Sequence, residues 1–390
     1  MLGFSTYAAL LPELRDAWRL TNAEAGIVGG MFFAGYVATV SYWTALTDRV
    51  DARKVYLAGS VIAGAASVGF GVFAAGFASA VLFQVLLGIG IAATYMPGLR
   101  LLSDRISGPG QSRSIATYTS FFGIGTALSL AAAGFIASSA GWRIAFVVAA
   151  SGPLIAGVLV FLLLQAIPPS GSRTSLSLFP FAAWREVLRN RACAGYTAGY
   201  MAHCLELFGS RGWMVAFLAF SATLHAGSTF PWQLPAIAAV INLLAVPASI
   251  FGNEMALKMG RRRWILLVMA GSGSCGLLVG FSAPWHWAIV LALLVVYSML
   301  VMAESGTLTA GLVAAAPAEL RGAAMGLYSL LGFGGGLLGP VVFGTALDLA
   351  GGAGSAVAWV IAYAAIGAGC LSAPVVARIS RRRSPWNASG

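Results

Sequence analysis

The sequence predicts an all-α polytopic membrane protein with twelve transmembrane helices in two pseudo-symmetric bundles of six. The prediction depends on the composition, on the length of the apolar segments and on an internal repeat. Of the 390 residues, 59% are hydrophobic and 9% are charged, whereas a soluble domain averages roughly 45–50% apolar and about 25% charged residues. A chain this apolar cannot bury its hydrophobic surface within itself, so we expect a lipid bilayer to surround it.

The apolar segments have the length of membrane spans. A span needs about 20 apolar residues, because a helix rises ~1.5 Å per residue and the hydrocarbon core is ~30 Å thick. Residues 1–14 are too short, and we interpret them as the outer half of a first helix that is incomplete at its N-terminal end. With that helix the count is twelve. The other eleven predicted spans are 24–46, 55–77, 79–102, 114–138, 141–164, 192–220, 231–251, 263–283, 286–314, 323–347 and 355–377.

An internal repeat supports two matched halves. Residues 44–54, TALTDRVDARK, form a charged turn between two apolar runs, and residues 253–263, NEMALKMGRRR, form a second such turn at an offset of 209. The glycine-rich segments 118–134 and 328–344 both begin with tyrosine and lie 210 residues apart. Two independent landmarks with nearly the same spacing indicate a duplicated architecture.

A polar stretch at 168–191 separates the halves. Part of it, 181–188, sets Trp184, Val187 and Leu188 against charged residues, a pattern typical of a helix at a membrane interface. We therefore predict four segments, which are an N-terminal six-helix bundle at 1–166, a cytoplasmic linker at 167–191, a C-terminal six-helix bundle at 192–378 and a basic cytoplasmic tail at 379–390.

A capping box marks the start of the second helix. The Thr21 hydroxyl and the Glu24 carboxylate have the spacing that satisfies the free backbone amides of a helix start. We expect this helix to begin near Asn22.

The basic residues set the orientation. If the turn at 44–54 faces the cytoplasm, 19 of the 23 lysines and arginines lie on that side, as the positive-inside rule requires. Both termini are then cytoplasmic, provided that the first span is complete, and we expect a multi-pass protein of the cytoplasmic membrane. This bias accounts for the net charge of +11, so we expect no nucleic-acid partner. The other four basic residues are Arg15, Arg19, Arg143 and Arg211.

The first charged turn carries a resemblance to a known family. It follows the pattern G-x-L-x-D-R-x-G-x-R, with Thr44 and Asp51 in place of the two glycines, and the second turn keeps Gly260 and its arginines. The residues of the pattern that the first turn retains are Leu46, Asp48, Arg49 and Arg53. With the span count and the central loop, the whole chain resembles the major facilitator superfamily. Within it, the chain is similar to nitrate/nitrite or cyanate permeases.

The resemblance implies that one bundle rocks against the other around a site near the membrane midplane. Charged side chains of the two turns are then candidates for a cytoplasmic latch, with ion pairs that form when the inner mouth closes and hydrate when it opens. The alternative is that the basic residues only anchor the topology. The candidates for the latch are Asp48, Arg49, Arg53, Lys54, Lys258 and Arg262.

Ionisable residues inside spans are costly and are functional hypotheses by default. The seventh span carries His203, Glu206 and Arg211, and the tenth carries Glu304. His203 and Glu206 are three residues apart and share a helix face. In the superfamily's fold, spans one, four, seven and ten line the central cavity, so the resemblance places both carboxylates there.

Two roles suit these buried carboxylates. Removal from water favours the protonated form, so Glu206 or Glu304 can carry a proton, which His203 can share. Alternatively, a carboxylate can pair with Arg211 or with a cationic substrate. Purely structural roles are the alternatives. Glu206 can form an ion pair, Glu304 can lie hydrated near the inner end of its span, and His203 can simply pack in the core.

Three further residues are candidates for the substrate site. Arg100, near the cytoplasmic end of the fourth span, can bind an anion, or it can serve as an anchor or latch member beside Asp104. Tyr95 and Tyr7 can donate hydrogen bonds into the cavity or pack in the core. Asp348 we expect at the outer surface, in water.

The sequence therefore predicts a secondary active transporter that moves a small solute by alternating access, coupled to protons. We expect it to act as a monomer without a cofactor or a metal. The sequence contains no phosphate-binding loop, zinc-type histidine pair or nucleophile elbow, which argues against an enzyme. The alternatives are a non-transporting membrane receptor or sensor on a transporter fold, and a polytopic membrane enzyme.

Overall fold

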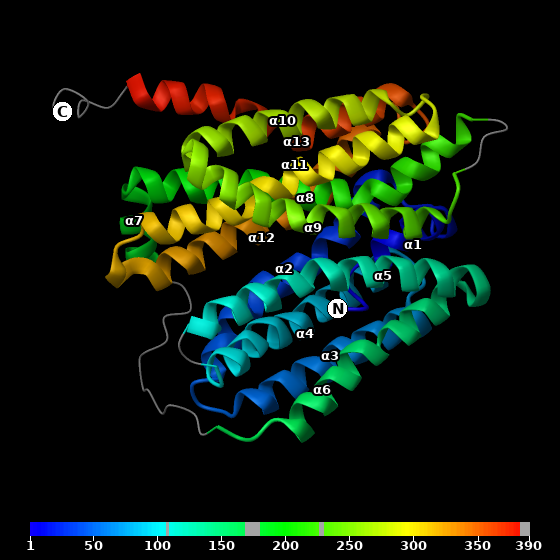
Figure 1. Cartoon of the computed structure of the whole chain (residues 1–390). Helices are drawn as coiled ribbons and strands as arrows, with labels where there is room; N and C mark the ends of the chain where they lie inside the picture. The colour runs from blue at the N-terminus through cyan, green and yellow to red at the C-terminus, as the bar shows by residue number, and fades with distance from the viewer. Residues whose placement is uncertain (107–108, 168–179, 226–229, 383–390) are drawn as a thin grey trace.

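A computed structural model describes residues 1–106, 109–167, 180–225 and 230–382, and the regular structure of these residues is helical (Figure 1). A short 3-10 turn, Ala318–Leu320, precedes α12. The helices are α1 (Thr6–Ala17), α2 (Asn22–Leu46), α3 (Ala52–Phe73), α4 (Phe77–Ser103), α5 (Pro109–Ala149), α6 (Ser151–Leu163), α7 (Phe181–Arg189), α8 (Arg191–Thr223), α9 (Leu234–Met259), α10 (Arg261–Phe281), α11 (Trp287–Ala315), α12 (Arg321–Leu349) and α13 (Ala356–Arg382).

Each predicted span is helical in the structure. Among the described residues, nine helical segments are long and apolar enough to cross a membrane, with α5 and α6 counted together as Phe121–Leu163. α8 falls outside this set and carries the ionisable residues His203, Glu206 and Arg211. The start of α2 is confirmed: Glu24 N–H donates to the Thr21 hydroxyl, and the Glu24 carboxylate accepts from Thr21 N–H at 2.9 Å.

One boundary between predicted spans lies inside a helix. The predicted spans 114–138 and 141–164 meet within α5, where Gly141 has a non-helical backbone with φ +82°. This left-handed conformation is accessible to glycine at little cost. The chain therefore turns at Gly141 and enters the next span in the last part of α5, continuing through α6.

The helices form two groups in chain order, α1–α6 and α8–α13. In Figure 1, α3–α6 lie on the side of the molecule opposite to α8–α13, and α1 and α2 lie between them. The two groups meet where α2 packs on α12, α9 packs on α5 and α8 packs on α1. Under the repeat found in the sequence, α2 corresponds to α9 and α5 corresponds to α12. The seams α2–α12 and α5–α9 are thus equivalent, as expected for two pseudo-symmetric bundles.

Glycines make the seams and the bundle cores tight. A Cβ atom on Gly26 or Gly30 of α2 would collide with backbone carbonyl oxygens of α12, those of Pro340 and Leu337. On α12 itself, a Cβ on Gly335 would collide with the carbonyl oxygen of Met201 in α8. The glycines of the segment 328–344 thus allow α12 to approach its neighbours closely.

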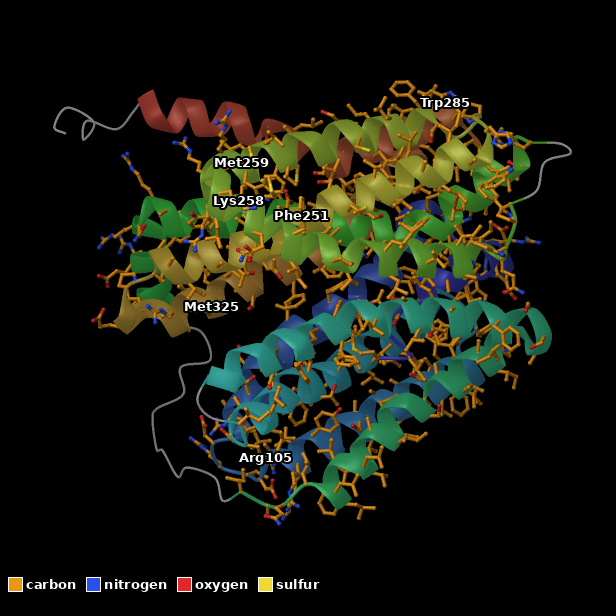
Figure 2. All side chains as sticks on the ribbon, viewed as in Figure 1. Arg105, Phe251, Lys258, Met259, Trp285 and Met325 are labelled. Atoms are coloured by element: carbon orange, nitrogen blue, oxygen red, sulfur yellow. The ribbon has the colours of Figure 1, made fainter. Side chains whose placement is uncertain are left out.

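The basic turns of the two groups share one end of the molecule. Arg105 follows α4 and Lys258 lies at the end of α9, and Figure 2 shows both at the end opposite to Trp285. α7 forms the predicted amphipathic helix, with Trp184 and Val187 buried. Residues 168–179 of the linker and 383–390 of the tail lie outside the described residues.

Candidate functional site

A cavity of about 60 Å³ lies between the two groups of helices. A cavity needs roughly 10–15 Å³ to hold one water, so this cavity has room for several atoms of a small solute. Its walls come from the start of the chain and from α1, α2, α4, α5, α8 and α12. The lining residues are Phe4, Ser5, Tyr7, Ala8, Leu11, Ala25, Gly29, Phe32, Phe33, Gln84, Thr126, Leu130, Phe208, Arg211, Gly212 and Pro340.

Arg211 brings a positive charge to this cavity. It lies on α8 and lines the cavity with Gly212. The one hydrogen-bond acceptor recorded for its guanidinium among the described residues is Met302 Sδ, at 3.4 Å. A thioether is a weak acceptor, so the guanidinium has donors left for an anion.

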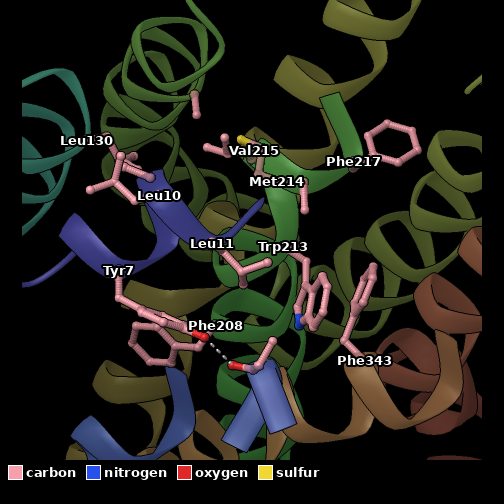
Figure 3. Close-up of a cluster of buried hydrophobic side chains, with 14 of the residues drawn as sticks. Tyr7, Leu10, Leu11, Leu130, Phe208, Trp213, Met214, Val215, Phe217 and Phe343 are labelled. Atoms are coloured by element: carbon pink, nitrogen blue, oxygen red, sulfur yellow. Dashed lines mark hydrogen bonds between the residues drawn. The ribbon is translucent and has the colours of Figure 1, made fainter. Parts of the chain in front are cut away.

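Aromatic side chains form the apolar walls. Phe33 of α2 meets Phe208 of α8 with ring centroids 4.4 Å apart, and Phe4 packs edge-on against Phe32 at 4.9 Å. Figure 3 shows Tyr7 beside Phe208, with the Tyr7 hydroxyl donating to the carbonyl of Ala25 at 3.0 Å. The predicted site residue Tyr7 thus lines the cavity, but its hydroxyl proton is used within the protein.

The predicted residues His203 and Glu304 meet inside the C-terminal group of helices. Nδ1 of His203 and Oε1 of Glu304 are 2.9 Å apart, and both side chains are almost fully buried. His203 Nε2 and Glu304 Oε2 are buried atoms without a hydrogen-bond partner among the described residues. Neither residue lines the cavity between the halves. α11, the tenth predicted span, contributes none of the described lining residues.

Glu206 lies in the same interior. Its Oε2 accepts from the Ser272 hydroxyl of α10 at 3.0 Å, and its Oε1 lies close to Gly276 of α10 and Gly367 of α13. Glu206 is fully buried. His203, Glu206 and Glu304 form what we call the acidic cluster.

Electrostatics constrain the protonation of the acidic cluster. A net charge in an apolar bundle is costly. The cluster of one imidazole and two carboxyl groups is neutral overall when it holds two titratable protons. Either both carboxyl groups are protonated beside a neutral imidazole, or one carboxyl group is protonated beside a carboxylate and an imidazolium. Loss of one proton leaves a buried charge of −1. Arg211 lies on the same helix as His203 and Glu206, close enough for its positive charge to act on the cluster through the low-dielectric interior.

Arg100 and Tyr95 lie on α4, away from the described cavity lining. Nη1 of Arg100 pairs with Asp48 Oδ1 at 2.6 Å, and its Nε donates to Asp104 at 3.1 Å. Arg100 and Asp48 thus join α4 to the first charged turn within one half. The carbonyl of Tyr95 accepts from the Tyr118 hydroxyl at 2.8 Å.

The other latch candidates lie at the ends of the helices. Arg53 pairs with Asp51 at 2.6 Å and donates to the carbonyl of Leu164 at 2.6 Å. Asp51 also caps α3, because its Oδ1 accepts from Arg53 N–H at 2.9 Å. The exposed latch candidates are Arg49, Lys54, Lys258 and Arg262.

At the opposite end, Asp348 of α12 bonds to the start of α2. Its Oδ2 accepts from Ala23 N–H at 2.7 Å, and its Oδ1 accepts from Nδ2 of Asn22 at 2.7 Å. We expected Asp348 at the surface in water, and it is exposed, but it also joins the two halves. This contact could not be predicted from the sequence, because the two partners lie 326 residues apart.

Gln84 is a polar cavity residue that was not predicted from the sequence, as are Ser5 and Thr126. Gln84 lies on α4, is 3% exposed and lines the cavity. The signal was present, because Gln84 is a lone amide inside the apolar segment 79–102.

The comparisons with known proteins agree with this architecture. The family model described as Major Facilitator Superfamily matches residues 1–340. The chain is 20% identical over 342 residues to the putative niacin/nicotinamide transporter NiaP of Bacillus subtilis, a match that covers 86% of this chain and 82% of that protein. It is 24% identical over 163 residues to the niacin transporter NiaP of Acinetobacter baylyi, covering 42% of this chain and 36% of that protein.

Solved structures share the fold. A bacterial homolog of the human lysosomal transporter Spinster, in an inward-facing and unoccupied conformation, matches with a TM-score of 0.71 and 18% identity over 97% of this chain and 92% of that one. The nucleoside transporter NupG matches with a TM-score of 0.71 and 14% identity over 98% of both chains. The match of the family model over most of the chain and these shared folds lead to one conclusion: this chain is a multi-pass membrane protein that belongs to the major facilitator superfamily of transporters.

Proposed function

We propose that the protein is a proton-coupled secondary transporter that moves a small organic anion by alternating access. The observation that carries the proposal is Arg211, a guanidinium that lines the cavity between the halves and whose recorded acceptor is a thioether. A carboxylate is the natural partner of a guanidinium in a site removed from water. The aromatic walls suit a flat apolar body on the same molecule.

The relatives support this substrate class. Niacin is a small aromatic carboxylic acid, and two of the relatives are named for niacin transport. A cavity of about 60 Å³ also favours a molecule of this size over a peptide or a lipid. We therefore use nicotinate as the first probe and treat its transport as the test of the proposal.

Proton coupling follows from the charges near the cavity. When the site is empty, the charge of Arg211 disfavours protons on the acidic cluster. A bound anion cancels that charge, so the cluster keeps its second proton. Such coupling is reciprocal, because a ligand that favours protonation must bind more tightly when the proton is present. Anion and proton would then bind and cross together.

The contacts between the halves support alternating access. The α2–α12 seam runs from Asp348 and Asn22 to the ring contact of Tyr36 with Phe333, 4.8 Å between centroids. In our proposal, 1–166 and 192–378 are the rocking units and 167–191 joins them. The end with Asp348 faces outward and is closed, while the charged turns and both termini lie in the cytoplasm. There Asp48, Arg49, Arg53, Lys54, Lys258 and Arg262 act as the latch. One copy of the chain is the transporting unit.

Uptake by proteoliposomes tests the proposal. An inward proton gradient should drive radiolabelled nicotinate above its external concentration, and a protonophore should abolish that accumulation. A receptor or sensor would bind nicotinate without accumulating it. Accumulation that is independent of the proton gradient would contradict proton coupling.

A further inference from the structure

The side-chain amide of Gln84 lines the cavity, where its N–H donors and its oxygen acceptor are available to a ligand. It lies in an apolar segment of α4, is 3% exposed and lines the cavity. No hydrogen bond to its side chain is recorded among the described residues. Burying an amide without partners is unfavourable, and the atoms of Gln84 face a space that a solute can enter.

The backbone around Gln84 is held rigidly. A Cβ atom on Gly35 of α2 would collide with the carbonyl oxygen of Val85, and one on Gly88 of α4 would collide with the carbonyl oxygen of Phe32. α4 and α2 are therefore in backbone contact at Val85, the residue after Gln84, and at Gly88, one turn further on. A side chain on so fixed a backbone is pre-organised for recognition, which lowers the ordering cost of binding.

Three hydroxyl residues line the cavity, Ser5, Tyr7 and Thr126, and the hydroxyl groups of the last two are already used. The Tyr7 hydroxyl donates to the carbonyl of Ala25 at 3.0 Å, and the Thr126 hydroxyl donates to the carbonyl of Phe122 at 2.9 Å. Gln84 and Arg211 keep their donors available. They come from different halves, because Gln84 lies on α4 and Arg211 lies on α8.

We infer that Gln84 is the second polar anchor of the site and determines specificity: it binds a neutral hydrogen-bonding group of an organic anion whose carboxylate is held by Arg211. This inference deepens the proposed function and rests on it. The substrate class becomes narrower, namely small aromatic carboxylates with a ring nitrogen or a hydroxyl group away from the carboxylate. A ligand of this class connects the two halves through one polar contact on each.

Four probes separate the two anchors. Nicotinate carries a carboxylate and a ring nitrogen, 3-hydroxybenzoate a carboxylate and a hydroxyl, benzoate the carboxylate alone, and nicotinamide the ring nitrogen without the charge. Their affinities are measured by titration calorimetry on the purified full chain in detergent. The wild type should bind nicotinate or 3-hydroxybenzoate about fivefold more tightly than benzoate, the effect of one net hydrogen bond.

Gln84→Met keeps the length of the side chain and removes the amide, and Gln84→Leu gives a second apolar replacement. Both should bind benzoate as the wild type does and should lose the fivefold preference. Gln165→Met, at an exposed glutamine, is the matched control and should keep it. A preference that survives in both Gln84 variants would overturn the inference, as would a wild type without the preference.

The same experiment shows whether the proposed function fails instead. If nicotinamide binds the wild type as well as nicotinate does, or if Arg211→Gln leaves nicotinate binding unchanged, the anion site at Arg211 is wrong and the assignment of Gln84 falls with it. If Arg211→Gln removes binding of all three carboxylates but Gln84→Met changes none of them, only the assignment of Gln84 is wrong.

Discussion

Asp348 of α12 caps the first turn of α2 at Asn22. Oδ1 of Asp348 accepts from the backbone N–H of Asn22 at 3.1 Å and from its side-chain Nδ2 at 2.7 Å. A carboxylate is stabilising at a helix N-terminus, where backbone amides are free and the helix dipole is positive. Because the two helices belong to different halves, this cap exists only while the halves are in contact at this end.

Asp348→Ala should shift the protein toward opening at this end. The lost cap is worth about 1 kcal/mol, so the open population should rise roughly fivefold. The measurement is alkylation of Ala8→Cys, at a cavity position, by a membrane-impermeant maleimide added on that side. Labelling should be about fivefold faster in the Asp348→Ala background.

Glu24→Ala is the matched control for this experiment. Glu24 caps the same helix end, but from within α2, so its loss affects open and closed states alike. It should leave the labelling rate nearly unchanged. Equal acceleration by both substitutions would mean that a frayed helix, and not a released seam, exposes the cavity.

Gly335→Leu should destabilise the C-terminal group of helices. A Cβ atom at this position would collide with the carbonyl oxygen of Met201 in α8, and overpacking of this kind costs about 1–3 kcal/mol. The thermal unfolding midpoint in detergent should fall. Gly334→Ala, on the next residue with no atom within 4 Å of its Cβ position, should leave the midpoint unchanged or raise it. Similar midpoints for the two variants would refute the close approach of α12 and α8.

Asp51 should stabilise the fold in a pH-dependent way. The hydrogen bonds and charge of Arg53 hold the pKa of Asp51 below its ordinary value. A carboxylate with a lowered folded-state pKa stabilises the fold above its unfolded pKa of about 3.9, and this contribution is lost as the pH falls through the lower folded-state pKa.

Asp51→Asn keeps an oxygen that can cap α3 and removes the charge. It should lower the free energy of unfolding at pH 7 by about 1 kcal/mol or less, and the difference from the wild type should shrink below pH 4. A difference that is constant from pH 7 to pH 3 would show that the ion pair with Arg53 contributes nothing.

Most of the fold could be predicted from the sequence, because lipid imposes length and polarity on each span. The capping box at Thr21 and Glu24 even fixed the first residue of α2. The boundary between the predicted spans 114–138 and 141–164 was also predicted correctly, because the structure turns at Gly141. The subgroup resemblance to nitrate/nitrite or cyanate permeases stays a prediction.

The candidate site was harder to predict from the sequence than the fold. Helix-face arguments placed His203 and Glu206 together but could not say whether that face of α8 meets the cavity or the interior of its own bundle. The structure places them in the interior, and Arg211, about two turns from His203, in the cavity. Which face of a helix meets which neighbour depends on packing between distant segments, and one sequence does not contain that information in readable form.

Glu206→Gln should uncouple transport from the proton gradient. An amide cannot carry the proton, yet its oxygen can still accept from the Ser272 hydroxyl, so folding should be intact. Nicotinate should still equilibrate across the membrane, but an imposed proton gradient should no longer concentrate it. Ser272→Ala, which keeps the carboxylate, should retain concentrative uptake. Unchanged gradient-driven accumulation in Glu206→Gln would remove Glu206 from the proton path.

The anion site at Arg211 is tested most directly by gradient-driven uptake of radiolabelled nicotinate into proteoliposomes containing either the wild type or Arg211→Gln, at matched protein content and thermal stability. Our account predicts concentrative uptake by the wild type and a loss of at least 100-fold in the variant, in line with the cost of removing one partner of a desolvated charge pair, about 3 kcal/mol or more. Equal uptake by the two proteins would contradict it.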